Sequence, residues 1–257
     1  MKRAIERHSV ATYFFITMIL SGLLLPLHFI FQSVGNYSVS FTQFAPALAV
    51  VVLAVLMKDK VTIPRIIYSL RFHGDQIKWF GLAFLIPFIC VAVSGVTLSF
   101  YSLEYVPWSG SGLFYILNIM AILLDCFAEE LGWRGFLLPI LQKKYTPIVS
   151  SLMVGTLWGI WHLNFTGGLL GFVLYSITIV ETSILMTWLY NKTNGNLTTM
   201  VVYHFTFSLF SHLLLWERFT LQLFIIEVVV FGLACMVVIL TNREMFFRNT
   251  GTVPVFP

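Results

Sequence analysis

Glu129, Glu130 and Arg134 are charged residues in a stretch that is otherwise almost wholly apolar, FAEELGWRGFLLPIL from Phe127 to Leu141. A charge at the depth of a bilayer is costly, so charged residues in membrane helices are rare and usually face a cavity or a partner. Residues four apart share one face of a helix, and we therefore expect Glu130 to pair with Arg134. Glu129 points to another face and has no cation nearby. A buried carboxyl group of that kind suits a general base or acid that works near neutral pH.

His162 in GTLWGIWHLNF and His204 in MVVYHFTFSLF are candidates for the same site, because each lies in another apolar stretch. Together with Glu129 they supply the groups that general acid–base chemistry needs. One carboxylate and two imidazoles also have the make-up of a three-ligand metal site, so the sequence leaves a divalent metal open. A structural alternative stays open as well. In that alternative the charged residues form one buried ion cluster, and each histidine is a hydrogen-bond donor between helices.

Three further acidic residues lie within apolar stretches. Asp125 precedes Glu129 by four residues. It therefore either brings a second negative charge to that face or pairs with another helix. Glu181 and Glu227 lie near the middle of two later apolar stretches. The sequence assigns them no role beyond a hydrogen bond to a neighbouring helix.

The composition indicates that these residues are surrounded by a membrane. Of the 257 residues, 58% are hydrophobic and only 10% are charged, and the mean hydropathy is +0.89. Soluble domains carry about 25% charged residues, so this chain lacks the residues to cover a water-facing surface. The isoelectric point near 9.0 is no sign of nucleic-acid binding, because the basic residues can be assigned to loops at the membrane surface. We expect an integral membrane protein that binds no nucleic acid.

Eight apolar stretches are about long enough to cross roughly 30 Å of hydrocarbon as helices. Helices are expected rather than strands because the apolar runs are continuous and do not alternate with polar residues. We therefore predict an all-α, polytopic membrane bundle that forms a single domain over residues 1–257. The predicted spans lie near residues 11–31, 41–57, 79–100, 113–138, 148–166, 168–190, 198–215 and 221–240.

The basic residues predict how this bundle is oriented. Of the 15 Lys and Arg residues, all but two fall before the first span or in loops on the same side of the membrane as the N-terminus. The exceptions are Arg134, which lies within a span, and Arg218. Because Lys and Arg are in excess on the cytoplasmic side of membrane proteins, we expect both termini to be cytoplasmic.

Three short motifs on separate predicted helices resemble those of the CPBP family of intramembrane proteases. This family includes the CAAX prenyl endopeptidases and bacterial bacteriocin-processing and immunity proteins, and its motifs are Glu-Glu-x-x-x-Arg, Phe-x-x-x-His and His-x-x-x-Asn/Asp. The matching segments of this chain are Glu129–Arg134, Trp158–His162 and His204–Ser208, within a motif region at 113–211. The resemblance implies a multi-pass protein of the bacterial plasma membrane that acts on a peptide or a lipidated protein.

The resemblance also implies a mechanism that uses no cofactor. Glu129 and His162 would activate a water for attack on a peptide carbonyl, and His204 with the residue at position 208 would stabilise the oxyanion. The chain departs from the family pattern at two positions. Trp158 replaces Phe and would keep an aromatic wall. Ser208 replaces Asn or Asp, and its shorter side chain must come closer to donate the same bond. Losing one oxyanion donor costs roughly 3–4 kcal/mol in a soluble protease.

Two functions of different classes follow from these residues. The first is a glutamate-dependent intramembrane endopeptidase that cleaves a membrane-associated, lipidated or leader peptide. The second is a non-catalytic membrane protein of the same fold that gives immunity to a bacteriocin, and Ser208 favours it. A transporter with a proton relay is third. It would need paired repeats or broken helices in two halves, and the sequence shows neither.

Overall fold

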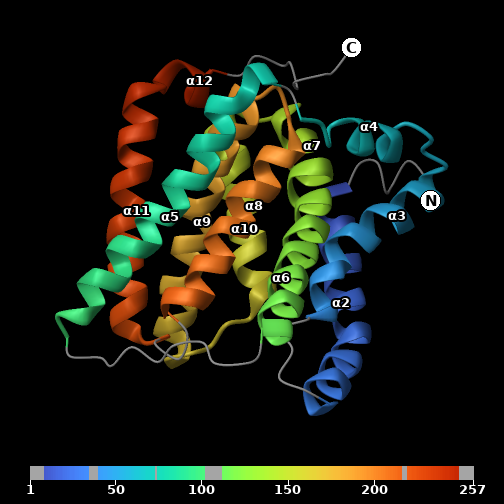
Figure 1. Ribbon diagram of the computed structural model, residues 1–257. Helices are drawn as coiled ribbons and strands as arrows, with labels where there is room; N and C mark the ends of the chain where they lie inside the picture. The colour runs from blue at the N-terminus through green and yellow to red at the C-terminus, as the bar shows by residue number, and fades with distance from the viewer. Residues whose placement is uncertain (1–8, 35–39, 73, 102–111, 216–218, 249–257) are drawn as a thin grey trace.

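The computed structural model describes residues 9–34, 40–72, 74–101, 112–215 and 219–248, and within these ranges it contains helices and no strand (Figure 1). The predicted all-α class is therefore confirmed. The elements are α2 (Ser9–Val34), η1 (Phe41–Phe44), α3 (Ala45–Met57), α4 (Thr62–Tyr68), η2 (Gly74–Gln76), α5 (Ile77–Ser99), α6 (Gly112–Gly132), η3 (Trp133–Leu137), α7 (Leu138–Gln142), α8 (Pro147–His162), α9 (Gly168–Lys192), α10 (Leu197–Leu215), α11 (Leu221–Thr241) and α12 (Arg243–Phe247).

Six helical stretches of the described chain are long and apolar enough to cross a membrane. They are Ser9–Leu27, Ile77–Ser99, Gly112–Gln142, Gly168–Lys192, Leu197–Leu215 and Leu221–Thr241. The other two predicted spans are shorter helices, Phe41–Met57 and the 16-residue α8. The count of eight spans stays a prediction. So does the cytoplasmic side of the termini, because residues 1–8, 249–257 and Arg218 lie outside the described ranges.

The predicted span at 148–166 is too long at its C-terminal end. Helix α8 stops at His162, because Leu163 adopts a left-handed conformation with φ 48° and ψ 36°. Gly167 and Gly168 also have positive φ angles, 78° and 73°, so the chain turns before α9 begins. Because the residues around position 163 are mostly apolar, hydropathy alone could not predict that the helix ends here. As a consequence, His162 is the last residue of its helix.

The helices that carry the three motifs pack around one another near the centre of the bundle (Figure 1). Helix α10 packs against both α5 and α6, and α9 packs against both α8 and α11. The continuous segment α6–η3–α7 contacts α3 and α10, and its η3 and α7 parts contact α8. Helices α2 and α3 pack against each other to the right of α6 in Figure 1, on the side opposite α5 and α11. The motif helices α6, α8 and α10 are therefore held from several sides.

Two glycines allow α8 to approach α9 closely. A Cβ atom at Gly155 would lie 2.7 Å from the Cα of Val180, and one at Gly159 would lie 3.0 Å from the Cα of Ser176. Small residues spaced by four bring membrane helices into backbone contact and compensate for the absence of a hydrophobic driving force in lipid. This packing fixes the position of Trp158, which lies between the two glycines in sequence, and of His162, which follows Gly159 by three residues.

A third glycine and a π-helical turn shape α6 at the first motif. A Cβ atom at Gly132 would overlap the hydroxyl of Tyr13 and the ring of Pro46, so only glycine lets α2 and α3 pack so closely here. The turn that follows, η3, has π-helical hydrogen bonding and carries Arg134. Such turns occur mostly as single insertions in α-helices and are frequent at functional sites.

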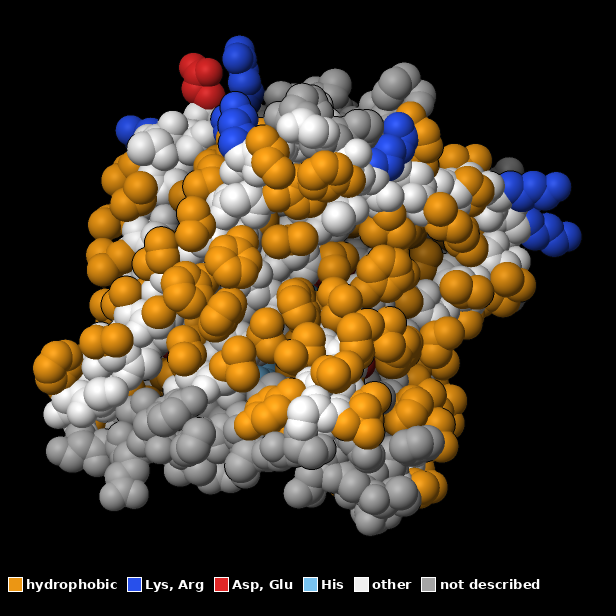
Figure 2. All heavy atoms as spheres, in the orientation of Figure 1, with side chains coloured by type: hydrophobic (Ala, Val, Ile, Leu, Met, Phe, Trp, Pro, Cys, Tyr) orange, Lys and Arg blue, Asp and Glu red, His pale blue; other side chains and the backbone are white. Residues whose placement is uncertain are grey.

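The outer surface of the bundle matches a lipid environment. Figure 2 shows a broad hydrophobic band across the visible face, with Lys and Arg side chains gathered at the end where α4 and α12 lie. On α11, Ile225, Val229, Leu233, Val237 and Leu240 are all exposed at nearly helical spacing. An apolar stripe of this kind is expected to face hydrocarbon rather than water. The chain is a multi-pass integral membrane protein.

Candidate active site

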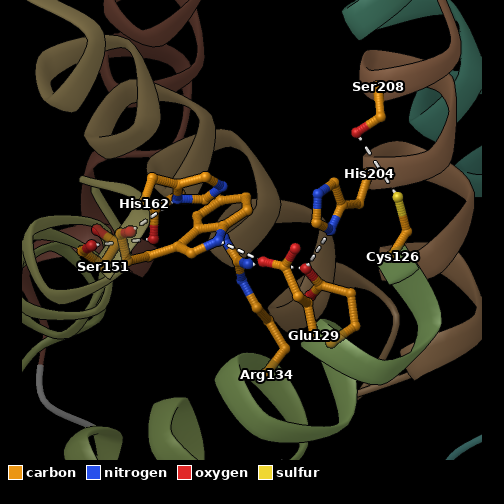
Figure 3. A network of polar contacts seen from close by, with 10 residues as sticks. Cys126, Glu129, Arg134, Ser151, His162, His204 and Ser208 are labelled. Atoms are coloured by element: carbon orange, nitrogen blue, oxygen red, sulfur yellow. Dashed lines mark hydrogen bonds and ion pairs between the residues drawn. The ribbon is translucent and has the colours of Figure 1, made fainter. Parts of the chain in front are cut away.

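Glu129, His162, His204 and Ser208 line one cavity of about 190 Å³. Glu129 comes from α6, His162 from the end of α8, and the other two from α10. In Figure 3, Glu129 and the two histidines lie near one another, and Ser208 lies one turn beyond His204 on the same helix. The structure therefore brings the three sequence motifs together, as expected. The catalytic role of each residue stays a prediction.

The predicted pair of Glu130 and Arg134 is present. Arg134 Nη1 donates to Glu130 Oε1 over 2.8 Å, and both side chains are fully buried. The sequence did not reveal that His204 Nδ1 lies 2.9 Å from the same oxygen. Glu130 and His204 are 74 positions apart, so no local spacing could indicate this contact. Glu130 is thus shared between a partner on its own helix and a histidine on α10.

The contact with Glu130 fixes the ring of His204. Because a carboxylate only accepts hydrogen bonds, His204 Nδ1 carries the proton and donates it. The opposite nitrogen, Nε2, is then left for the cavity that His204 lines. If His204 takes up a second proton, the Glu130 carboxylate stabilises the resulting charge, and Nε2–H becomes a donor to whatever occupies the cavity.

The ring of His162 is also held through its Nδ1 atom, but by a backbone group of its own helix. Its Nδ1 lies 2.9 Å from the backbone carbonyl oxygen of Trp158, one turn earlier in α8. A carbonyl oxygen only accepts, so Nδ1–H donates, and Nε2 of the neutral ring keeps its lone pair. His162 also lines the cavity with Glu129. A lone pair beside a carboxyl group can take a proton from a water, as a general base requires.

Trp158 is more than the aromatic wall that the sequence suggested. Its indole Nε1–H donates to Glu129 Oε2 over 2.6 Å, and the guanidinium Cζ of Arg134 lies 4.2 Å from a Trp158 ring centroid. The ring of His204 packs edge-on against Trp158, with centroids 5.1 Å apart. A phenyl ring would keep the packing but has no donor. A buried Trp usually finds a hydrogen-bond partner for its N–H, and that rule could have indicated this role.

The sequence suggested two alternatives for Asp125, a place on the same face as Glu129 or a bond to another segment, and the structure shows both. Asp125 lines the same cavity as Glu129. Its Oδ2 also accepts a hydrogen bond from the backbone N–H of Ser40 over 3.3 Å. Ser40 directly precedes η1, so Asp125 joins α6 to the start of the 41–57 segment. Its partner is therefore a backbone group, and no cation of the described residues pairs with it.

Ser208 occupies the expected position one helical turn beyond His204. Its Oγ accepts a weak hydrogen bond from the thiol of Cys126 over 3.6 Å (Figure 3). Cys126 also lines the cavity and lies in α6, one turn before Glu129 and Glu130. The hydroxyl of Ser208 thus keeps its own proton available as a donor.

Sequence reasoning did not place Tyr175 or Glu227 at this cavity, which both residues line. Tyr175 comes from α9 and Glu227 from α11. The ring of Tyr175 packs against that of His162, with centroids 5.4 Å apart. Neither residue belongs to a motif, and only the packing of α9 against α8 and α11 brings them here.

Within the described ranges, no three His, Cys, Asp or Glu side chains are grouped closely enough to hold a metal ion. The alternative in which Glu129, His162 and His204 form a three-ligand site is therefore not supported by their arrangement. His204 and His162 each use Nδ1 within the protein. The four predicted catalytic residues present to this cavity the carboxyl group of Glu129, two histidine Nε2 atoms and the Ser208 hydroxyl.

The fold and the site define a multi-pass helical membrane protein with a buried cavity lined by one glutamate and two histidines of the three motifs. Residues 111–210 match the family model described as type II CAAX prenyl endopeptidase Rce1-like. The matched segment nearly coincides with the predicted motif region at 113–211. The resemblance inferred from the motifs is confirmed, because this part of the chain is similar to the Rce1-like CAAX prenyl endopeptidases.

Individual relatives include proteins with two different names. The chain is 28% identical over 149 residues to CAAX prenyl protease 2 of Methanococcus maripaludis, covering 53% of this chain and 54% of that protein. It is 24% identical over 255 residues to Lysostaphin resistance protein A of Staphylococcus haemolyticus, covering 95% of this chain and 68% of that protein. The alignment thus spans about half the length of the archaeal relative.

Proposed function

We propose that this chain is an intramembrane endopeptidase in which Glu129 acts as the general base. The observation that supports this most is the single cavity that Glu129, His162, His204 and Ser208 line from three helices. The substrate would be a membrane-associated, lipidated or leader peptide. Similarity to the CAAX prenyl endopeptidase family supports an endopeptidase of the membrane.

The first chemical step is the activation of a water by Glu129 and His162. The Glu129 carboxylate takes one proton of the water as the water oxygen attacks the peptide carbonyl carbon, and His162 Nε2 accepts a hydrogen bond from the other water proton and orients it. Trp158 Nε1–H holds one carboxylate oxygen, Oε2, so the other oxygen of Glu129 is the one that receives the proton. That proton is then passed to the departing amine nitrogen, which completes the hydrolysis.

The second part of the mechanism is stabilisation of the oxyanion by His204 and Ser208. Because His204 Nδ1–H is committed to Glu130, His204 donates from Nε2 as an imidazolium. The Glu130 carboxylate balances that charge together with Arg134. Ser208 supplies the second donor from one turn further along α10. Donors fixed in advance of the reaction are worth most where charge develops in the transition state.

Cleavage of a peptide library by the purified full chain in detergent or nanodiscs tests this proposal. Wild-type protein should cleave a subset of peptides, and Glu129→Gln should cleave none while it elutes and unfolds like wild type. The amide has the size of the carboxyl group but cannot accept the proton. Peptide cleavage by Glu129→Gln at the wild-type rate would refute the role of Glu129.

A second candidate function is resistance or immunity without proteolysis. Two observations favour it: the alignment with Lysostaphin resistance protein A extends over 95% of this chain, and Ser208 replaces the amide or carboxyl residue of the family motif. Expression in a sensitive bacterium separates the two functions. Resistance that survives Glu129→Gln would support a binding role, whereas resistance that is lost with it would support proteolysis.

A further inference from the structure

Glu227 is a buried acidic residue that the proposed mechanism does not use. Its side chain comes from α11, is only 3% exposed, and lines the same cavity as Glu129. No hydrogen bond or ion pair joins it to any side chain or backbone group in the described ranges. A carboxyl group in this position has lost water without gaining a partner, which is unfavourable unless a ligand supplies one.

The position of Glu227 is defined by aromatic contacts next to the site. Phe224, one turn earlier on the same face of α11, packs against Tyr175 with ring centroids 5.9 Å apart. Tyr175 in turn packs against His162. Glu227 therefore lies on the wall of the cavity that α9 and α11 build. A peptide whose scissile bond lay at Glu129 and His162 would extend a neighbouring side chain toward this wall.

The cavity lining is rich in acidic groups. It contains the carboxyl groups of Asp125, Glu129 and Glu227 together with three histidine rings, and no Lys or Arg of the described chain lines it. The first two are partnered, because Asp125 accepts from Ser40 N–H and Glu129 accepts from Trp158 Nε1–H. Glu227 alone offers both carboxylate oxygens to an occupant. Such a lining attracts a cation and disfavours an anionic group such as a free carboxylate.

We propose that Glu227 forms a substrate subsite that binds a cationic side chain, Lys or Arg, next to the scissile peptide bond. The inference rests on the proposed function to the extent that the cavity must be where the peptide binds. It adds a substrate class: peptides with a basic residue beside the cleavage site. Burial makes the pairing strong, because a carboxylate and an ammonium interact more strongly away from water than at a surface.

Binding to an inactive protein tests the subsite without the need for turnover. The probes are fluorescently labelled acetyl-Leu-Lys-Leu-amide and its matched peptide with norleucine in place of Lys, titrated into full-length Glu129→Gln in nanodiscs. We expect the Lys peptide to bind about tenfold or more tightly. Adding Glu227→Gln should bring the ratio of the two dissociation constants close to one. Glu227→Asp, which keeps a shorter carboxylate, should retain part of the preference.

Glu181→Gln is the matched control. Glu181 is another acidic residue in the middle of a helix, α9, but it does not line the cavity. Its replacement should leave the preference for the Lys peptide unchanged. The inference is wrong if the Lys peptide binds no better than the norleucine peptide, if neither binds, if Glu227→Gln keeps the preference, or if Glu181→Gln removes it to the same extent as Glu227→Gln.

Cleavage by the wild-type chain separates this inference from the proposed function. A Lys preference in binding that depends on Glu227, with no cleavage of any library peptide, would overturn the endopeptidase and leave the subsite standing. Cleavage that depends on Glu129 but shows no dependence on Glu227 or on a basic residue would leave the endopeptidase standing and overturn the subsite.

Discussion

The two adjacent glutamates of the first motif lie in contrasting surroundings. Glu130 is fully buried and bonded through Oε1 to both Arg134 and His204. Glu129 is equally buried, but it accepts one hydrogen bond from Trp158 and otherwise faces the cavity. One carboxyl group thus joins α6 to α10 and fixes a histidine, and the other lines the cavity, where we propose that it acts on the substrate. The comparison teaches that neighbouring identical residues in a membrane helix can have different surroundings, one within the helix packing and one at a cavity.

The largest effect on the Glu130 side is expected from Arg134→Ala. This change leaves Glu130 as a buried charge without its cation and removes the group over the Trp158 ring. Breaking a buried ion pair by removing one partner costs about 3–5 kcal/mol. Thermal unfolding of the purified protein should therefore show a large loss of stability.

Arg65→Ala is the matched control for that prediction. Arg65 Nη2 donates to the backbone oxygen of Gly135 over 2.9 Å, but the residue is only partly buried and forms no ion pair with a carboxylate in the part of the chain that the structure describes. Its loss should cost about 1 kcal/mol, which is typical of a single hydrogen bond. If Arg134→Ala unfolds no more easily than Arg65→Ala, the structural role of the Glu130 pair is wrong.

The next largest effect is expected on catalysis, from changes at Ser208, which lines the cavity. Ser208→Ala should slow turnover of a cleavable peptide on the order of 10²-fold, with little change in KM, because the bond to the oxyanion forms fully only in the transition state. Ser208→Asn restores a residue of the family motif and should keep or raise activity. Steady-state kinetics of both variants on one peptide measure this.

Two outcomes for Ser208 would change the account. If Ser208→Ala cleaves like wild type, its hydroxyl is not an oxyanion donor. If wild type cleaves nothing and Ser208→Asn does, the natural chain is a family member without activity, and the resistance function takes precedence.

The smallest effect is expected at Trp158, which contacts both Glu129 and Arg134. Trp158→Phe restores the family residue and keeps an aromatic ring, but it removes the 2.6 Å bond to Glu129. We expect kcat to fall about tenfold with KM nearly constant, since a hydrogen bond to a charged group contributes about 1.5–3 kcal/mol and a water can replace part of it.

Trp161→Phe provides the comparison for Trp158. Trp161 directly precedes His162 in the same helix, but it does not line the cavity, and its Nε1–H donates to Ser21 Oγ over 2.7 Å rather than to Glu129. The two variants lose similar bonds in different places. A larger fall in kcat for Trp161→Phe than for Trp158→Phe would contradict the importance of the Trp158 bond.

The sequence predicted those features that depend on local periodicity. Hydropathy located the membrane helices, and the four-residue spacing correctly paired Glu130 with Arg134. The motif pattern also named the four residues that converge on one cavity. Each of these inferences needs only helix geometry or a pattern within a few residues.

The features that the sequence did not predict depend on how helices pack. The bond from His204 to Glu130 joins α10 to α6, and the bond from Trp158 to Glu129 joins α8 to α6. Glu227 reaches the cavity only because α11 packs on α9. The early end of α8 depends on the backbone conformation of Leu163, which hydropathy does not reflect.

The most direct test of the central claim replaces each of the two glutamates by glutamine and measures cleavage and thermal unfolding on the same preparations. We predict that Glu129→Gln unfolds within a few degrees of wild type and cleaves nothing. Glu130→Gln should unfold at a clearly lower temperature, because it weakens the bonds to Arg134 and His204. An active Glu129→Gln, or a Glu130→Gln variant as stable as wild type, would contradict the division of roles between the two residues.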